Sequence, residues 1–515
     1  MKCLQELKKF CVKKESVGYE LRELGKLTEL GGELSIHNLE KVATEEEAAE
    51  AKLVCKRDLK ELWLVWGTDH QHSTEYGVLD ALQPHHNLGA LGIINHGGIN
   101  GPSWLFGDIS IKMLGSLHLE GVSWGTLPPF GQLMHLTSLT LTSISVFREI
   151  RPGLFGVTDK SFMSLKRIVL DRLPEFIKWV AGATTHCFSR LEYISCKDCP
   201  NLCAVPFLEC SVSYTHLSHF SIDGCPKLSL PPMPHTSTLT YCHVALPSSK
   251  LTYSSSRGEM SIDGYSGGLA WHNLRNIVTV DISNVSHFSL TELSKQKSLK
   301  TLEIFGESGM QSMALLSNLT CLTRLKLVDC ENLTVDGFNP LVRVNLDTLA
   351  VYNRDKCPSC TISVDLFSEL AGARTNLSLR AGSFRLRDLS VDSISAVLVA
   401  PICTLLAATL EMLEFRHDQR AESFMGEEEG ALQLLTFLNF LYFGDCPNLP
   451  SLPQGLHSLP SLEQLRVEGC PQIRCLPKGA FPTSLQLLAV RSCSSELQEE
   501  VQKLKATNPD FQVLV

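Results

Sequence analysis

The sequence has few charged residues and no excess of basic ones. Only 20% of its 515 residues are Asp, Glu, Lys or Arg, and 46 basic against 55 acidic side chains give a net charge of −9. Because nucleic-acid binding needs clustered Lys and Arg for phosphate contacts, this balance argues against a nucleic-acid partner. With 44% hydrophobic residues, the chain is long enough to bury several domains or one extended array.

The sequence also lacks an uninterrupted apolar segment of membrane-helix length. Residues 393–410 carry no charge, but Ser393, Pro401 and Thr409 interrupt them, so we expect a buried segment and no membrane span. The start, MKCLQELKKFCVKKES, has basic residues without the apolar core of a signal peptide. We therefore expect a cytoplasmic protein whose 19 cysteines, an odd number, are reduced and mostly buried.

Motifs of catalysis and cofactor binding are missing as well. The sequence has no GxxxxGK phosphate loop followed by Ser or Thr, no HExxH helix and no GxGxxG turn. GYSGG (264–268) matches the GxSxG pattern of hydrolases, but no Asp and His partners are evident, and a flexible Gly- and Ser-rich loop is the better interpretation. CPSC (357–360) has the spacing of a redox or zinc half-site but lacks a second pair. The sequence thus predicts no enzyme, no cofactor and no metal site.

What the sequence does contain is a repeat. LEQLRVEGCPQIRCLP (462–477), LNFLYFGDCPNLPSLP (438–453) and LEYISCKDCPNLCAVP (191–206) share the template LxxLxLxxCPxLxxLP. Neighbouring copies are 23 or 24 residues apart in several places, which is a spacing typical of leucine-rich repeats. Looser copies begin at Leu59, Leu88, Leu114, Leu136, Leu165, Leu217, Leu299, Leu322, Leu346, Leu386, Leu410 and Leu485.

The repeat predicts an α/β solenoid. The fourth and sixth positions of each copy alternate with their neighbours as in a strand, which sends their leucines inward. One copy buries about six apolar side chains, worth roughly 10 to 15 kcal/mol, while ordering its residues costs at least about as much. Because a lone copy cannot fold, we expect a leucine-rich repeat solenoid, a curved horseshoe with a short-stranded parallel β-sheet on its concave face. Irregular loops, 3₁₀ turns and short helices would form its convex face.

The array is not uniform along the chain. Leu217 and Leu299 are 82 residues apart, with a Pro-, Ser- and Gly-rich stretch between them. We expect irregular repeats or a break in curvature there. The predicted organisation is N-terminal repeats in 1–228, an irregular segment in 229–275, and C-terminal repeats in 276–515 with an insertion near 353–380.

Both ends of the chain give further expectations. Leu7, Phe10 and Val12 continue the leucine template without a polar cap, so we expect an exposed solenoid end. The chain would then be a truncated product, a fragment, or a recognition half that needs a neighbour. At the other end, residues 494–515 predict a short amphipathic helix with Leu497, Val501 and Leu504 inward.

Two local patterns concern turns and caps. The ninth template position turns back under the sheet, where a small apolar thiol fits, so its cysteine predicts a buried filler and no chemistry. Thr44 and Glu47 form a capping-box pattern that starts a helix, with Lys52, Lys56 and Arg57 expected at its C-terminal end. The ninth-position cysteines are Cys199, Cys225, Cys330, Cys446, Cys470 and Cys493.

Three stretches carry a family resemblance. Residues 21–66, LRELGKLTELGGELSIHNLEKVATEEEAAEAKLVCKRDLKELWLVW, closely resemble the leucine-rich region of plant intracellular nucleotide-binding disease-resistance proteins of the coiled-coil class. SLHLEGVSWGTLPPFGQLMHLTSLTLTSI (116–144) and the Cys-Pro repeats from residue 438 are similar to later repeats of that family. The resemblance implies a non-enzymatic domain that senses a pathogen effector or a guarded host protein in defence. It also implies that the domain holds an adjoining nucleotide-binding module at rest.

The chain departs from the family pattern, because the coiled-coil and nucleotide-binding modules of this receptor class are absent from it and would be partners. Two other interpretations stay open. A leucine-rich substrate receptor of a ubiquitin ligase should show an F-box segment, which is missing. A regulatory or decoy fragment would act in trans on a nucleotide-binding module.

The residues between and beside the inward leucines would line the concave face, where aromatic and arginine side chains are the expected anchors of a protein partner. For large apolar members such as Trp63 and Phe305, the alternative is packing against neighbouring loops. The predicted partner-binding residues are Trp63, His118, Arg167, Tyr193, His219, Phe305, Arg324, Tyr352, Arg416, Tyr442, Gln464, Arg466, Glu468 and Arg491.

Overall fold

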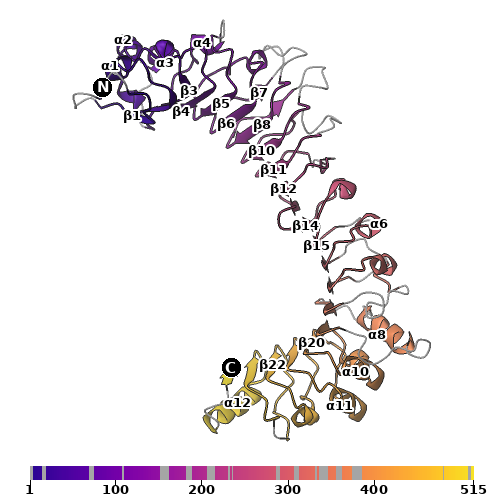
Figure 1. The fold of residues 1–515 in the computed structure, drawn as a ribbon. Coiled ribbons are helices and arrows are strands. Elements are labelled where there is room, and N and C mark those ends of the chain that lie inside the picture. Colours follow the sequence, from indigo (N-terminus) through magenta and orange to yellow (C-terminus); the bar gives the residue numbers. More distant parts are fainter. Residues whose placement is uncertain are drawn as a thin grey trace. The chain divides into compact units, whose positions relative to one another are not determined.

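The computed structural model divides the chain into two compact units, Met1–Arg257 with Gly267–Arg275, and Gly258–Ser266 with Asn276–Val515. We call them unit 1 and unit 2. Both are built from stacked repeats that each add one short strand to a sheet (Figure 1). The structure describes residues 4–13, 19–68, 75–106, 110–150, 162–180, 188–205, 215–229, 232–234, 236–285, 290–306, 312–330, 333–335, 346–354, 362–373, 385–479, 481–507 and 512–514.

Unit 1 contains a ladder of parallel strands closed by one antiparallel strand. The parallel strands pair in the order β1 (Lys9–Cys11), β2 (Gly32–His37), β3 (Leu59–Val65), β4 (Ala90–Ile94), β5 (Ser116–Glu120), β6 (Ser138–Thr142), β8 (Arg167–Asp171), β10 (Tyr193–Lys197), β11 (His219–Asp223) and β12 (Tyr241–Leu246). β13 (Ser249–Ser254) then returns antiparallel to β12, and β7 (Glu149–Ile150) pairs with β9 (Lys178–Trp179) in a separate small sheet. The described helices are α1 (Leu21–Gly25), η1 (Leu39–Lys41), α2 (Glu45–Ala49), η2 (Leu53–Cys55), α3 (Glu75–Ala81), α4 (Ser103–Phe106), η3 (Phe130–Gln132) and η5 (Trp271–Asn273).

Unit 2 contains a second ladder, parallel throughout its described strands. They pair in the order β14 (Glu259–Asp263), β15 (Thr279–Ser283), β16 (Thr301–Phe305), β17 (Arg324–Val328), β18 (Thr348–Tyr352), β19 (Asp388–Val391), β20 (Met412–Arg416), β21 (Phe440–Gly444), β22 (Gln464–Glu468), β23 (Leu487–Arg491) and β24 (Gln512–Leu514). Its described helices are α6 (Leu290–Leu293), η6 (Ala314–Asn318), α8 (Ile362–Ala373), α9 (Ile394–Val397), α10 (Ala400–Leu406), α11 (Gly426–Leu432), η7 (Gln454–Ser458) and α12 (Ser495–Thr507).

The leucine template places the strands, as predicted. In the copy that begins at Leu462, β22 starts two residues later, and Leu465 and Val467 inside it are at most 1% exposed. Every other copy named above also holds a strand, and the second and fourth residues of the regular five-residue strands are buried. The prediction of a leucine-rich repeat solenoid is confirmed.

A left-handed residue ends most strands and turns the ninth position inward. Asp445 and Gly469 directly follow β21 and β22 and have φ angles of 51° and 65°, a region that only Gly, Asn and Asp enter at low cost. The turn brings Cys470 under the sheet, where its thiol lies 3.4 Å from the carbonyl oxygen of Glu468 and 3.7 Å from that of Phe443 in the preceding repeat. The predicted filler role is confirmed for the ninth-position cysteines, which are buried except for the half-buried Cys493.

The long gap between Leu217 and Leu299 contains regular strands after all. β12, β14 and β15 continue the repeats, and the tight β12–β13 hairpin is the irregular element among them. In the predicted insertion near 353–380, the described part forms helix α8. The segment boundaries proposed from the sequence remain predictions.

The prediction for the helix after Thr44 is right at its start and wrong at its end. The Oγ1 of Thr44 accepts a hydrogen bond of 3.2 Å from the Glu47 N–H, and the Glu47 carboxylate accepts one of 3.0 Å from the Ala43 N–H. The helix already ends at Ala49, however, and Lys56 does not lie at its C-terminus. Lys56 is only 2% exposed and its Nζ donates to the carbonyl oxygens of Leu24 and Leu27, at 2.8 Å each. The two carbonyl groups belong to the C-terminal end of α1 and the turn after it, where the N–H groups of a following helical turn are missing.

Three smaller expectations concern the ends and the uncharged segment. Residues 393–410 form the short helices α9 and α10, and no helix in the part of the chain that the structure describes is long and apolar enough to cross a membrane. The predicted C-terminal helix is α12, with Leu497 and Val501 fully buried and Leu504 partly exposed. The CPSC segment (357–360) lies outside the described residues.

Candidate protein-binding surface

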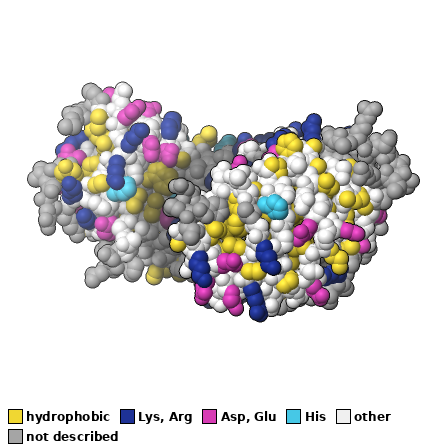
Figure 2. All heavy atoms as spheres, turned by 90° about the horizontal axis from the view of Figure 1, so that it is seen from below, with side chains coloured by type: hydrophobic (Ala, Val, Ile, Leu, Met, Phe, Trp, Pro, Cys, Tyr) yellow, Lys and Arg dark blue, Asp and Glu magenta, His cyan; other side chains and the backbone are white. Residues whose placement is uncertain are grey.

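The side chains opposite the leucine core form one face of each sheet, which we call the strand face. It consists of the first, third and fifth residues of the regular five-residue strands and their equivalents in the longer strands. All the predicted partner-binding residues lie at such positions. Figure 2 shows basic and acidic side chains interspersed over the described surface that it presents. Local groupings therefore decide what each part of the strand face can bind.

The first grouping in unit 1 joins Trp63 and His118. Gly92 lies between them on the intervening strand β4, and a Cβ atom there would overlap the Trp63 ring. Trp63 therefore lies across Gly92, with its ring centroid 5.3 Å from that of His118, and its Nε1 donates to Glu61 at 2.7 Å. The Trp63 ring packs on a neighbouring strand and is only partly available to a partner.

The second grouping in unit 1 is a stack across four successive strands, which we call the aromatic ladder. The Arg167 guanidinium lies 3.6 Å from the centroid of the Tyr193 ring. His219 stacks between Tyr193 and Tyr241, with ring centroids 4.0 and 4.5 Å away and interplanar angles of 3° and 11°. Burial, followed by the charge of Arg167, lowers the pKa of His219 below its usual value. The imidazole is therefore mainly neutral at physiological pH.

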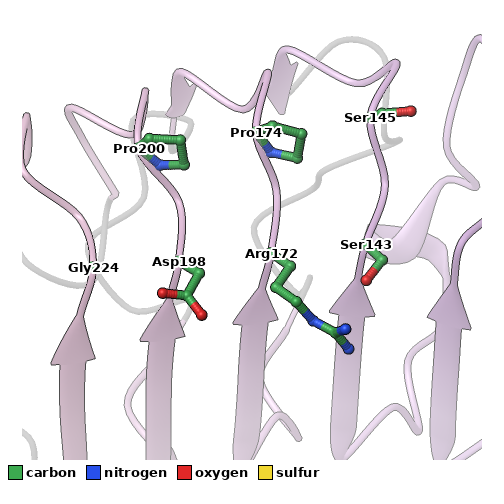
Figure 3. Close-up of a pocket in the computed structure, with 7 residues that line it drawn as sticks. All are labelled: Ser143, Ser145, Arg172, Pro174, Asp198, Pro200 and Gly224. Atoms are coloured by element: carbon green, nitrogen blue, oxygen red, sulfur yellow. The ribbon is translucent and has the colours of Figure 1, made fainter.

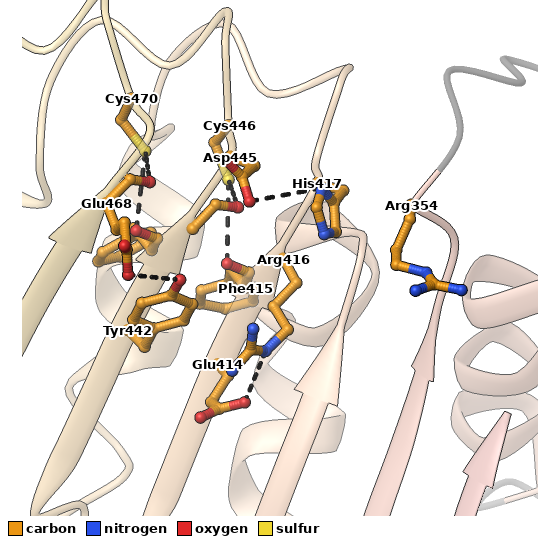
Figure 4. A network of polar contacts seen from close by, with 12 residues as sticks. Arg354, Glu414, Phe415, Arg416, His417, Tyr442, Asp445, Cys446, Glu468 and Cys470 are labelled. Atoms are coloured by element: carbon orange, nitrogen blue, oxygen red, sulfur yellow. Dashed lines mark hydrogen bonds and ion pairs between the residues drawn. The ribbon is translucent and has the colours of Figure 1, made fainter. Parts of the chain in front are cut away.

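The largest grouping of predicted residues is in unit 2. Arg416, Tyr442, Arg466, Glu468 and Arg491 come from four adjacent strands and line a single hollow of about 280 Å³. Figure 4 shows part of this network, with the Tyr442 hydroxyl directed at Glu468 and Arg416 bonded to Glu414. The remaining lining residues are Glu414, Phe440, Val467, Ala489 and Leu514.

Two small residues create the hollow. Gly444 is in register with Arg416 on one side and Glu468 on the other, and it has no side chain to separate them. A Cβ atom there would overlap the Tyr442 ring, so the ring lies over this glycine and is only 8% exposed. Ala489 is in register with Arg466, and its small side chain leaves space beside the Arg466 side chain.

The arginine side chains around the hollow differ in whether a carboxylate pairs with them. The Arg416 Nε donates to Glu414 at 2.8 Å, and the Tyr442 hydroxyl donates to Glu468 at 3.4 Å. Burial raises the pKa of Tyr442 to about 12, so its hydroxyl keeps the proton that it donates. Among the described residues, the Arg466 side chain donates a hydrogen bond to the neutral amide of Gln464 alone, at 3.2 Å.

Beside the hollow, Arg416 also faces Tyr352, which lies two strands away. The guanidinium is 4.7 Å from the centroid of the Tyr442 ring and 5.9 Å from that of Tyr352. Asp392 follows the intervening strand β19, and its carboxylate accepts hydrogen bonds of 2.8 and 3.2 Å from the backbone and side-chain nitrogens of Asn353. Tyr352 thus extends the same surface toward β18.

Two predicted residues lie outside these groupings. Phe305 contacts the Lys326 ammonium, 4.9 Å from its ring centroid, and Arg324 is exposed on the next strand. Sequence reasoning also missed Tyr241 and Phe440. Both begin a strand two residues after a leucine, and for Tyr241 the signal was obscured because Cys242 and Val244 replace the usual leucines.

A separate groove of about 510 Å³ lies in unit 1 where four strands end (Figure 3). Ser143, Arg172, Asp198 and Gly224 form the left-handed turns there, and Pro174 and Pro200 contribute apolar rings. Arg172 is already matched by Asp171 and Glu120, at 3.1 and 3.6 Å. None of the predicted residues lines this groove.

Comparisons with known proteins agree with the repeat pattern. Residues 21–144 match the family model described as R13L1/DRL21 LRRs. Putative disease resistance protein RGA1 of Solanum bulbocastanum is 36% identical over 174 residues, which are 33% of this chain and 17% of that protein. Disease resistance protein RGA2 of the same species is 38% identical over 142 residues, which are 27% of this chain and 14% of that protein. The chain therefore spans less than a fifth of the length of these relatives.

Among solved structures, a leucine-rich repeat protein of Leptospira interrogans aligns over 95% of this chain and 91% of its own, at 13% identity and a TM-score of 0.33. This TM-score is too low to bear on function. The strand ladder with its buried leucines shows that the chain is a leucine-rich repeat solenoid. Over residues 21–144 it is similar to the R13L1/DRL21 leucine-rich repeats, and over about a third of its length it is similar to plant disease-resistance proteins.

Proposed function

We propose that this chain is the non-enzymatic recognition part of a plant immune receptor that acts in the cytoplasm. It binds a pathogen effector or a guarded host protein through the strand face. The similarity to plant disease-resistance proteins supports a role in plant immunity. Leucine-rich repeats present extended strand surfaces that suit protein partners.

The observation that carries the proposal is the hollow in unit 2. Five residues predicted from the repeat as anchors line it together, although Arg416 and Arg491 are 75 positions apart in the sequence. Arginine and tyrosine at the centre of an interface contribute more binding energy than most other residues. Tyr442 is held in place by its neighbours, so little conformational entropy is lost when a partner covers it.

We also propose that the chain restrains an adjoining nucleotide-binding module. The support is the resemblance of residues 21–66 to that receptor class and the greater length of the relatives. This second role needs surfaces that contact the module, and it does not depend on the hollow.

The test is a receptor that joins this chain to the nucleotide-binding part of RGA2, expressed in leaves and challenged with pathogen isolates. We expect at least one isolate to trigger cell death, and the double variant Tyr442→Ala, Arg466→Ala to lose the response. Arg474→Ala is the matched control, because Arg474 is an exposed arginine outside the strands.

Two results would contradict the proposal. If the double variant accumulates to the normal level and still responds, the hollow is not the recognition site. If no isolate triggers a response and the chain silences an intact receptor supplied beside it, the regulatory or decoy interpretation is correct instead.

A further inference from the structure

We propose that the hollow in unit 2 selects its partner by an acidic side chain placed next to an apolar one. This rests on the proposed function only in taking the partner to be a protein. It names the chemistry that the partner must present.

The first argument is the surplus of positive charge. Three arginines and two glutamates line the hollow, in a chain whose net charge is −9. The Oε2 of Glu414 accepts hydrogen bonds from the Arg416 guanidinium at 2.8 Å and from the Ser390 hydroxyl at 2.6 Å. The charge of this carboxylate is therefore already matched by Arg416.

The second argument is the state of the other two arginines. Arg466 donates to a neutral amide and lies 5.3 Å from the centroid of the Phe440 ring, and no carboxylate among the described residues forms an ion pair with it. Arg491 is exposed and in register with Glu468, yet no ion pair within 4.0 Å joins it to any residue that the structure describes. Both guanidinium groups can thus donate hydrogen bonds to a carboxylate of a partner protein.

The positions of the two arginines suit one shared carboxylate. Arg466 is the third residue of β22, and Arg491 is the fifth residue of the adjacent strand β23. Strand spacing and rise place their backbones on the order of 8 Å apart, which is within the reach of two arginine side chains converging on one group. Each guanidinium can donate two parallel hydrogen bonds to a carboxylate, which fixes its orientation.

The third argument is the apolar part of the lining. Phe440, Ala489 and Leu514 contribute no charge, and the Tyr442 ring occupies the space beside Gly444 that a side chain would fill. An apolar side chain from the partner would be removed from water here, while its acidic neighbour reaches the arginines. At about 280 Å³ the hollow is at the lower end of the roughly 300 to 1,000 Å³ range of ligand pockets, so it has room for a small number of side chains.

The test measures binding of three labelled dipeptides to the full chain by fluorescence polarisation. They are Glu-Phe, Gln-Phe and Lys-Phe, each acetylated and amidated so that only the side chain differs in charge. We expect Glu-Phe to bind about tenfold or more tightly than Gln-Phe, because charge-assisted hydrogen bonds are lost with the amide. Lys-Phe should bind weakest.

Variants locate the binding. Arg466→Gln and Arg491→Gln should each remove most of the preference for Glu-Phe, whereas Arg466→Lys should retain part of it. Ala489→Trp fills the hollow without changing its charge and should weaken binding of all three peptides. Arg474→Gln, outside the strand face, should change nothing, and circular dichroism checks that each variant is folded.

The proposal is wrong if no peptide binds at millimolar concentration, if Gln-Phe or Lys-Phe binds as well as Glu-Phe, or if the arginine variants keep the full preference. The proposed immune function is tested separately by the leaf assay. A chain that prefers Glu-Phe in solution but gives no response in leaves would keep the chemistry of the hollow and overturn the receptor role.

Discussion

At the scale of single residues, the cysteines fall into two environments. Cys199, Cys225, Cys446 and Cys470 are fully buried at the ninth position of their repeats. The hydrogen bond to the Cys470 thiol, together with burial, raises the pKa of Cys446 far above its usual value. Burial likewise raises the pKa of Cys242, Cys330 and Cys403 to about 12. The thiols of Cys446, Cys242, Cys330 and Cys403 therefore stay protonated at physiological pH and are poor nucleophiles.

This difference predicts a labelling pattern. Iodoacetamide at neutral pH should modify the exposed Cys55, Cys203, Cys321 and Cys475 at least about a hundredfold faster than the buried ninth-position cysteines, because the latter react only after local unfolding. Mass spectrometry of tryptic peptides gives the rates, and the same reaction in denaturant should label all of them alike. Fast labelling of Cys470 in the native chain would contradict the filler role.

Lys56 is the second case at this scale. Its Nζ donates to two carbonyl oxygens of unit 1 at 2.8 Å, and burial lowers the pKa of its ammonium group. Lys56→Met should lower the free energy of unfolding by about 1 to 3 kcal/mol. The Leu27 carbonyl group loses its ammonium donor, and the Leu24 carbonyl group is left with the hydrogen bond from the Leu27 N–H. Urea unfolding measures the change. Lys60→Met, an exposed lysine on β3, should stay within about 0.5 kcal/mol of the parent, and an equal effect of both variants would show that the buried contacts add nothing.

The sequence predicted side-chain direction well and side-chain partners poorly. The period of two placed Arg466 outward and Leu465 inward, and both are found so. It gave no sign that Lys56 turns toward α1, since its carbonyl partners are about thirty positions away in the chain. The near-complete coverage of Tyr442 was missed for a similar reason. The coverage of Tyr442 depends on Gly444, and the sequence does not distinguish this glycine from other strand residues.

At the scale of elements, the aromatic ladder links β8, β10, β11 and β12 through their first residues. His219 lies between two tyrosine rings, and its folded-state pKa is below the usual 6.5. As the pH falls, the unfolded chain binds a proton on this histidine before the folded chain does. Its stabilising contribution is therefore complete above the unfolded pKa and decreases as the pH falls from there toward the folded pKa.

His219→Phe should remove this pH dependence while keeping an aromatic ring in the stack. We expect the thermal midpoint of the parent chain to fall more than that of the variant between about pH 8 and about pH 5. His135→Phe, at an exposed histidine outside the ladder, should leave the parent's pH dependence unchanged. Identical pH profiles for the parent and His219→Phe would mean that the stack holds a charged imidazole as readily as a neutral one.

Elements were predictable where leucine fills the template. Strands such as β22 and β5 followed directly from it. β12 was missed because Cys242 and Val244 occupy its inward positions, and β15 because Val280 and Ile282 do. The packing needs an apolar side chain of suitable size, which several residues supply. The antiparallel strand β13 interrupts the repeat, and the spacing of the leucine template does not predict it.

At the scale of the whole molecule, stability is distributed along a one-dimensional array. Each described strand pairs with its immediate neighbours, and the described contacts divide into two compact units. In such arrays the stability of a repeat depends on itself and the repeats beside it. Damage to one repeat should therefore stay local.

Leu465→Ala tests this in unit 2, and Leu62→Ala is its matched counterpart in unit 1, since both leucines are completely buried in mid-strand. Each change should cost about 2 to 5 kcal/mol locally, through lost apolar contacts and the cavity left behind. Hydrogen exchange measured by mass spectrometry should show this loss in the mutated strand and its neighbours, β21 to β23 for Leu465→Ala and β2 to β4 for Leu62→Ala. Protection in the other unit should stay at the parent level. If Leu465→Ala lowered protection in β3 as much as in β22, the two units would unfold as one, and recognition at the hollow would be energetically coupled to the whole chain.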